Sequence, residues 1–246
     1  MGTCISKSGG TSSGHGYNVD SATGSPAQHD SYTEERSPRR ASSDLSHLSD
    51  LSRNRSLNRL EASEAQAAVS DVLHFVRETY YRPNLKSGNK VHGNGGPEEA
   101  DRQARATLEV ERMRSQYDPL TAAMQGEAHQ CQELSLLAMH HLENRGLQAQ
   151  ILELGGDDEA VTHDVAIIGP ASNPLPTDMT EWHPDVYVCD PWSNIACRAS
   201  DYPDQFTRKM EKWEEAGKLV GFQAKGFVLP TDPDWMRDVL HGQKMV

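Results

Sequence analysis

Three side chains that lie far apart in the sequence could together form a thiol site. Cys131 opens a stretch with helical periodicity, His163 stands in an otherwise apolar run, and Asp190 follows another apolar run. A thiol becomes a strong nucleophile when its thiolate is stabilised, and the first turn of a helix offers free N–H groups and the positive end of the backbone dipole. An imidazole can then act as general base while a carboxylate fixes its tautomer. This order of residues predicts a Cys, His, Asp triad.

Each of these residues alone also has an ordinary structural interpretation. A buried cysteine on a helix usually serves as a small hydrophobe, and an Asp-Pro pair commonly opens a turn. Only the order of the three residues favours a thiol site. Cys189 and Cys197 are interpreted as structural, although Cys189 stands beside Asp190 and should be tested.

The elements that would position the triad follow from the periodicity of the apolar residues. A helix is expected from about residue 130 until Gly146 ends it, with Cys131 in its first turn. Strands are expected at residues 147–154, 160–168 and 185–189. The short acidic turn between the first two strands favours antiparallel pairing. The predicted fold class is therefore α+β, with the helix that carries Cys131 packed on an antiparallel sheet.

The rest of the chain predicts elements to which we assign no chemistry. Further helices are expected at residues 63–81, 97–117, 118–124, 202–217 and 232–241, and a further strand at 221–229. The helix at 97–117 is highly charged, which is typical of a solvent-exposed face.

Composition divides the chain into two parts. Only 36% of the residues are hydrophobic, and the shortfall is concentrated in Met1 to Leu60, which contains fourteen serines and six glycines. Such a segment cannot bury enough surface to offset the entropy of ordering. We therefore expect a disordered tail at 1–60 and one folded domain at 61–246.

Charge and apolar runs exclude several classes of protein. The net charge is −12, and residues 61–246 hold thirty acidic against seventeen basic side chains. A domain this acidic repels phosphate backbones, so nucleic-acid binding is disfavoured. No apolar run has the length of a membrane span or the place of a secretory signal. We expect neither a transmembrane protein nor a conventionally exported one.

The cysteines and histidines do not indicate a metal site or another cofactor. The four cysteines are too few for a disulfide framework, which favours a reducing compartment. Cys189 and Cys197 lack the C-x-x-C spacing of a zinc knuckle, and the His140-His141 pair has no ligand partners at helical spacing.

The first six residues carry a possible lipid signal. Met1-Gly2-Thr3-Cys4-Ile5-Ser6 fits the N-myristoylation pattern at Gly2, with Cys4 placed for a second acyl chain. One myristoyl chain gives only marginal membrane affinity, and a palmitoylated cysteine beside it makes the attachment stable. A pattern this short also occurs by chance. We favour lipidation, with the following tail acting as a tether.

At the triad residues the sequence resembles the papain-like thiol-enzyme superfamily, and more narrowly its transglutaminase-like branch. The motifs are Gln125-Gly126 shortly before Cys131, the run Thr162-His163-Asp164-Val165, and the run Cys189-Asp190-Pro191-Trp192. The resemblance implies that Cys131 is the nucleophile, His163 the general base and Asp190 the orienting carboxylate. It also implies that Gln125 donates a hydrogen bond to the developing oxyanion.

The N-terminus and the triad together are similar to the HopX/XopE-type effectors of plant-associated bacteria. A Ser-rich N-terminus looks like a type III secretion signal, while myristoylation uses a eukaryotic transferase. The resemblance implies a bacterial protein that is injected into a host cell, acylated there and held at the cytoplasmic face of the plasma membrane. Its partners would be that membrane and a host protein substrate. A eukaryotic origin stays open.

The residue types leave the reaction open. A protease and a glutamine deamidase both use water as acyl acceptor, whereas a transglutaminase uses an amine. We favour hydrolysis of a host protein amide. The alternative from another class is a membrane-tethered interaction module in which Cys131, His163 and Asp190 are core residues without a catalytic task.

Overall fold

The computed structural model describes residues 62–155, 161–172, 174–223 and 225–246. The predicted tail at 1–60, with the lipidation residues Gly2 and Cys4, lies outside these ranges. The described chain is a mixed α+β structure with two antiparallel sheets, which confirms the predicted fold class.

The larger sheet has five strands in the order β5-β4-β3-β2-β8. Their bounds are β2 Ala149–Gly155, β3 Val161–Ile168, β4 Tyr187–Asp190, β5 Ile195–Arg198 and β8 Gln243–Met245. The sequence predicted β2, β3 and β4 within a few residues, and the expected antiparallel pairing of β2 with β3 is confirmed. It did not predict β5 or β8, because four residues and three residues are too short to show a period.

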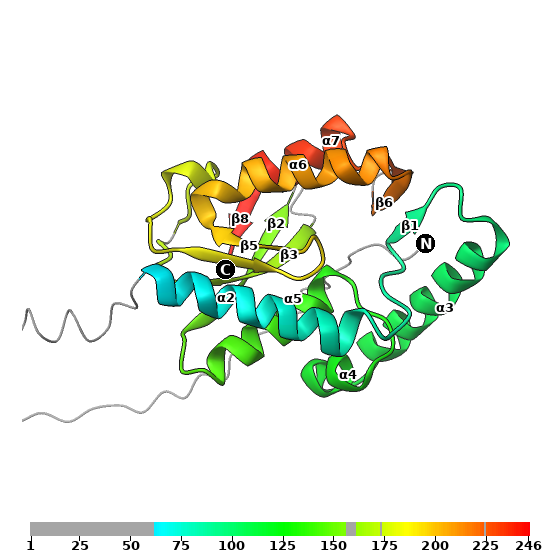
Figure 1. Cartoon of the computed structure of the whole chain (residues 1–246), viewed down its shortest axis with the longest axis horizontal. Coiled ribbons are helices and arrows are strands. Elements are labelled where there is room, and N and C mark those ends of the chain that lie inside the picture. Colours follow the sequence, from blue (N-terminus) through cyan, green and yellow to red (C-terminus); the bar gives the residue numbers. More distant parts are fainter. Residues whose placement is uncertain (1–61, 156–160, 173, 224) are drawn as a thin grey trace, which may run out of the picture. The chain divides into compact units, whose positions relative to one another are not determined.

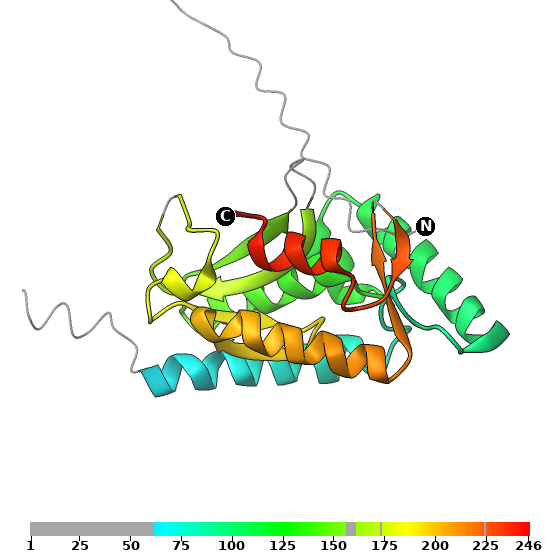
Figure 2. The ribbon, with the colours of Figure 1, turned by 90° about the horizontal axis from the view of Figure 1, so that it is seen from above.

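Helices cover both faces of this sheet (Figure 1). Helix α2 (Ala62–Val76) and helix α5 (Cys131–Glu143) pack on one face, while α6 (Tyr202–Glu215) and α7 (Pro233–His241) contact the sheet from the opposite side. The same arrangement is visible from above in Figure 2. One apolar core joins the inner sides of these helices to both faces of the strands. The sheet therefore has no solvent-exposed face over its central strands β3 and β4.

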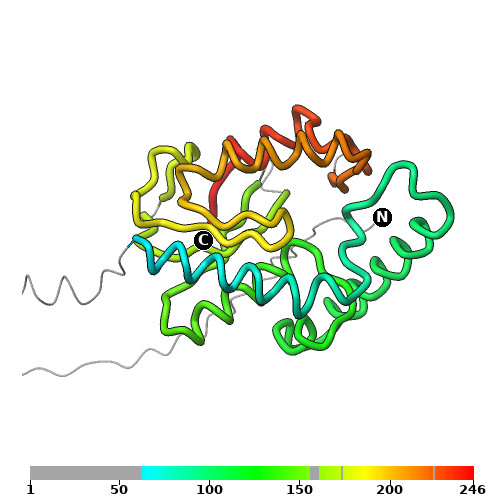
Figure 3. The backbone as a smooth tube through the Cα atoms, viewed as in Figure 1, coloured from blue at the N-terminus to red at the C-terminus, as the bar shows by residue number. Residues whose placement is uncertain are grey.

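Helix α2 continues into a π-helical turn, η1 (Arg77–Tyr81), so that the predicted helix at 63–81 is confirmed with a wider last turn. Helices α3 (Gly96–Arg114) and α4 (Pro119–Gln125) follow at the positions expected. Asp118 caps α4 by accepting a hydrogen bond from the N–H of Leu120, and Pro119 occupies the first turn. The path of the chain through these helices can be followed in Figure 3.

The prediction of a single strand at residues 221–229 is wrong. The structure has two strands there, β6 (Lys218–Phe222) and β7 (Gly226–Val228), which pair as a hairpin. Gly226 has a φ of +81°, a value that permits a tight reversal which the apolar pattern does not reveal. Strand β6 also pairs with β1 (Lys90–His92), so the second sheet has the order β1-β6-β7. The sequence did not predict β1.

No helix within the described ranges combines the length and the apolar character required to cross a bilayer.

Replacing Gly169 by alanine should destabilise the fold more than the same change at Gly146. Both glycines have positive φ, +106° at Gly169 and +78° at Gly146, but a Cβ at Gly169 would overlap the carbonyl oxygen of Asp185. Gly146 has open space around it. We expect urea unfolding to show a loss of about 3 kcal/mol for Gly169→Ala and about 1 kcal/mol for Gly146→Ala. Equal losses of unfolding free energy in the two variants would contradict the overlap expected at Gly169, the residue that follows β3.

Candidate functional site

Cys131 is the first residue of α5, as the sequence predicted. The residue before it, Gln130, is the N-cap of the helix, and Glu133 Oε2 accepts a hydrogen bond from its backbone N–H at 3.0 Å. Arg114, the last residue of α3, donates from Nε to Glu133 Oε1 at 2.7 Å. These bonds hold the N-terminus of α5 in place, and they put the Cys131 sulfur at the positive end of the helix dipole.

His163 and Asp190 meet inside the core. Nε2 of His163 lies 2.9 Å from Oδ2 of Asp190, and both side chains are fully buried. They come from neighbouring strands, because β3 and β4 pair with Ala166 opposite Cys189. Asp190 ends β4, and its side chain points to the same face of the sheet as Val165 and His163. The structure thus joins two of the three predicted triad residues directly.

The carboxylate of Asp190 accepts hydrogen bonds from three residues. Besides His163, the Tyr202 hydroxyl donates to Oδ2 at 2.9 Å, the Ser193 backbone N–H donates to Oδ1 at 2.9 Å, and the Ser193 hydroxyl donates to Oδ2. Burial by itself would raise the pKa of Asp190, but His163 and the bonds from Ser193 bring that pKa below its usual value. Asp190 is therefore ionised at neutral pH.

An ionised Asp190 determines which nitrogen of His163 can act as a base. In a neutral imidazole only one nitrogen carries a proton, and a carboxylate selects the tautomer with that proton on Nε2. Nδ1 then carries the lone pair. Nδ1 is buried and has no hydrogen-bond partner within the described residues. A base with a fixed tautomer and an unoccupied nitrogen is what a triad histidine requires.

Aromatic rings enclose the imidazole of His163. The centroid of its ring lies 5.1 Å from that of Trp192, 5.8 Å from that of Phe206 and 6.3 Å from that of Trp235. Phe206 belongs to α6 and Trp235 to α7, so His163 faces the layer formed by these helices. Trp192 is 1% exposed, and its indole shields the pair of His163 and Asp190 from water.

Asp164 is a site residue that the sequence analysis did not single out. Its Oδ2 lies 3.8 Å from Sγ of Cys131, and its backbone carbonyl accepts a hydrogen bond from the Ser135 hydroxyl of α5 at 2.8 Å. Its Oδ1 is buried without a hydrogen-bond partner in the described part of the chain. Burial raises the pKa of Asp164 to about 7. The sequence did contain a signal that could have identified Asp164, namely a charged residue within an otherwise apolar strand.

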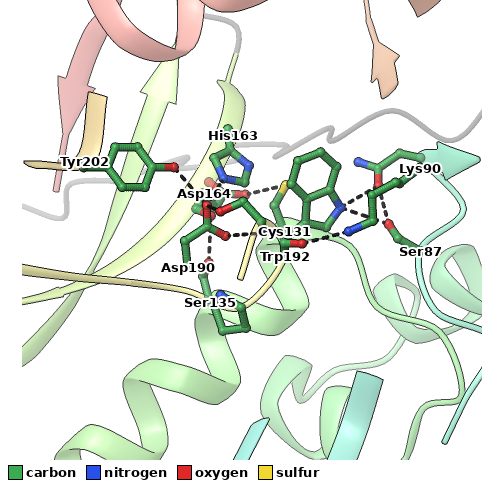
Figure 4. A network of polar contacts seen from close by, with 12 residues as sticks. Ser87, Lys90, Cys131, Ser135, His163, Asp164, Asp190, Trp192 and Tyr202 are labelled. Carbon is green, nitrogen blue, oxygen red and sulfur yellow. Dashed lines mark hydrogen bonds and ion pairs between the residues drawn. The ribbon is translucent and has the colours of Figure 1, made fainter. Parts of the chain in front are cut away.

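Strand alternation explains why Cys131 contacts Asp164 and not His163. Consecutive side chains of a strand point to opposite faces, so His163 faces α6 and α7 while Asp164 faces α5. A bulge where the register shifts between Leu154 and Gly155 lies beside His163. Figure 4 shows His163, Asp164, Asp190 and Cys131 in one network of polar contacts. Contact between the sulfur and Nδ1 of His163 is not part of it.

The remaining predicted residues have simpler surroundings. Gln125, the expected oxyanion donor, ends α4 and is exposed. Cys189 is fully buried, its thiol contacts the carbonyl oxygen of Val69 at 3.5 Å, and burial raises its pKa. Burial also raises the pKa of Cys197 to about 12. These two thiols are thus unreactive at neutral pH, in keeping with the structural role expected for them.

Within the described ranges, no group of three or more His, Cys, Asp or Glu side chains is arranged to hold a metal ion.

Comparisons of this chain with protein-family models, with curated proteins and with solved structures found no match.

The Asp164→Asn variant should change how stability depends on pH. Because the folded-state pKa of Asp164 is raised to about 7, its carboxyl contributes most to stability below the unfolded-state pKa of about 4, and that contribution is lost as pH rises through 7. Asp164→Asn removes this part of the pH dependence. For a pKa difference of about three units it amounts to up to about 4 kcal/mol of unfolding free energy. Urea unfolding at pH 4.5 and pH 7.5 measures it.

An exposed aspartate provides the control for this experiment. Asp204→Asn on α6 makes the same chemical change at the surface and should leave the pH dependence of the wild type intact. If Asp164→Asn and the wild type lose stability in parallel between pH 4.5 and 7.5, the carboxyl of Asp164 does not titrate in this range.

Proposed function

We propose that this chain is a cysteine-dependent amide hydrolase, either a protease or a glutamine deamidase. In this proposal Cys131 is the nucleophile, His163 the general base and Asp190 the orienting carboxylate. The observation that carries it is the buried pair of His163 and Asp190. Nδ1 of His163 has no hydrogen-bond partner among the described residues, and the next residue of the same strand, Asp164, contacts the Cys131 sulfur.

The reaction would proceed in two halves. Nδ1 of His163 takes the thiol proton, the thiolate attacks the carbonyl carbon of the amide, and the proton passes to the departing amine or ammonia. A thioester to Cys131 is left. Water then attacks the thioester, giving up a proton to His163, and the acid and the free thiol are released. Asp190 stabilises the imidazolium formed in each half, because it remains ionised in the core.

The proposal requires the sulfur to approach His163 during the reaction. Because the two side chains face different helical layers without substrate, one of them would have to reorient in the complex. Asp164 influences this step, because its carboxylate beside the sulfur would oppose formation of a thiolate. With a pKa of about 7, Asp164 is protonated in part of the molecules at neutral pH and does not oppose the thiolate in them.

The arrangement of elements is compatible with a papain-like or transglutaminase-like core. Helix α5, which begins at the proposed nucleophile, packs on the antiparallel strands β2 and β3, and the proposed base and carboxylate lie on neighbouring strands. Gln125 remains the proposed oxyanion donor. Because its side chain is exposed at the end of α4, it would have to turn toward the substrate.

For its biological role we propose a lipid-anchored type III effector of the HopX/XopE type. The proposal rests on the sequence pattern at Gly2 and Cys4 and on the Ser-rich segment that follows. Acylated at these residues, the protein would act on a host protein at the cytoplasmic face of the host plasma membrane.

The second candidate is a tethered module without catalysis. It is favoured by one observation: the sulfur of Cys131 contacts Asp164, while His163 points toward the opposite helical layer. A protein-glutamine transglutaminase is a third possibility that differs from the proposed hydrolase only in the acyl acceptor.

Alkylation distinguishes the enzyme from the module. In the reduced full-length protein we expect iodoacetamide at pH 6.5 to modify Cys131 at least about tenfold faster than Cys189 or Cys197, whose pKa values burial raises. His163→Gln should remove this advantage while circular dichroism shows that the fold is kept. Asp190→Asn should reduce it. If Cys131 reacts no faster than a thiol of the protein unfolded in urea, the result supports the tethered module without catalysis.

Proteomics distinguishes the reactions. A host-type lysate is treated with the wild type and with Cys131→Ala, and the products are searched for new N-termini and for one-dalton mass gains at glutamine. New N-termini indicate a protease, and mass gains alone indicate a deamidase. Loss of the general base should slow either reaction by about 10²- to 10⁴-fold in His163→Gln. Products that also form with Cys131→Ala would refute the assignment of the nucleophile.

A further inference from the structure

Three basic side chains gather around two aromatic rings beside the candidate site. The guanidinium carbon of Arg77 and Nζ of Lys90 lie 5.0 Å and 4.9 Å from the centroid of the Tyr81 ring. Nζ of Lys90 and Nζ of Lys218 lie 4.2 Å and 5.0 Å from the centroid of the Trp213 ring. Two basic side chains thus share each ring, and Lys90 belongs to both pairs.

The cations come from elements that are far apart in the sequence. Arg77 opens η1, Lys90 opens β1 and Lys218 opens β6, and β1 pairs with β6 so that His92 lies opposite Lys218. A fourth cation, Lys209, extends from α6. Burial lowers the pKa of Lys209, and the charges of Arg77 and Lys218 lower it further. We call Arg77, Lys90, Lys209 and Lys218 the basic cluster.

No member of the basic cluster forms an ion pair with a carboxylate in the described part of the chain. Other basic residues do, for example Arg102 with Glu99 and Arg114 with Glu133. The carboxylate that attracts three of the four cations is Asp190, and its hydrogen bonds go to other groups. In a chain with a net charge of −12, four neighbouring basic side chains without an ion pair among the described residues are unexpected.

The basic cluster is attached to the end of β4. Nζ of Lys90 donates to the backbone carbonyl of Trp192 at 2.8 Å and lies 4.6 Å from the centroid of its ring, and Arg77 donates from Nη1 to the carbonyl of Pro191. Trp192 also packs against the imidazole of His163. Figure 4 shows Lys90 on one side of Trp192 and the polar network of Asp190 on the other. A ligand bound to the basic cluster would therefore be separated from the imidazole of His163 by the side chain of Trp192.

We propose that the basic cluster binds a phosphoryl group. Burial and the neighbouring basic groups lower the pKa of Lys90. Aromatic rings attract cations but carry no net charge, so they do not neutralise the repulsion within the cluster, whereas an anion would favour its charged form. A single carboxylate would compensate one charge, whereas a phosphoryl group carries close to two and offers three acceptor oxygens. Arg77 supplies the planar fork that matches phosphate, and the lysines supply point charges. This binding does not depend on whether Cys131 is a nucleophile.

Thermal unfolding of the full-length protein with sodium tripolyphosphate tests the proposal. Because the anion binds the folded state, tripolyphosphate at about ten times its Kd should raise the midpoint by about 3–5 °C above that in sodium chloride of equal ionic strength. The double variant Lys209→Gln, Lys218→Gln should lose at least about tenfold in affinity by calorimetry. Both lysines are partly exposed and lie outside the polar network of His163 and Asp190.

A charge-matched control excludes a general effect of charge. Arg105→Gln with Arg237→Gln removes two exposed cations that pair with Asp101 and Asp234, and it should keep the affinity of the wild type. A midpoint shift that survives in the lysine variant, or that sodium chloride reproduces, overturns the proposal. The absence of binding to every phosphoryl probe also overturns it.

A second arm identifies the source of the phosphoryl group. Neutral phosphatidylcholine vesicles are compared with vesicles that also carry phosphorylated inositol lipid. Binding of tripolyphosphate together with lysine-dependent binding to the second kind of vesicle supports the site and assigns it to a lipid headgroup. Binding of tripolyphosphate alone supports the site and assigns it to a free phosphorylated ligand.

Discussion

The buried carboxylate of Asp190 is the interaction on which the arrangement of the site depends. Removing a charge from water is costly unless hydrogen bonds replace its hydration, and here they come from His163, Tyr202 and Ser193. These donors belong to β3, α6 and the turn after β4. One side chain therefore connects the sheet to the helical layer above it and determines the tautomer of His163.

Much of this framework could be predicted from the sequence. Long periodic segments gave α2, α3, α5, α6 and α7, and β2, β3 and β4 were found because their apolar runs are bounded by turn residues. The pairing of His163 with Asp190 was also predicted, since residues on adjacent strands can share a face. The short strands β1, β5 and β8 were missed because they form through pairing with longer strands.

What could not be predicted is which side chains share a face. The sequence shows His163 and Asp164 as neighbours, but the pleat directs them to different helical layers, and that depends on the register of β3. The sequence therefore suggested His163 as the partner of Cys131, whereas in the structure Cys131 contacts the next residue, Asp164. The basic cluster was invisible for a related reason: its members are separated by up to 141 positions, from Arg77 to Lys218, and only the pairing of β1 with β6 brings Lys90 and Lys218 together.

The pairing of β8 with β2 matters for how the protein is handled. Gln243–Met245 cover the outer edge of β2, opposite the residues that pair on their other side with His163 and Asp164. If proteolytic trimming or a bulky affinity tag displaced these three residues, the N–H and C=O groups of β2 would become an open sheet edge. Open edges recruit strands from other molecules and lead to aggregation. A purification tag is therefore safer away from residue 246. For preparations that precipitate, mass spectrometry of the intact protein is a useful check on whether residues 243–245 have been lost.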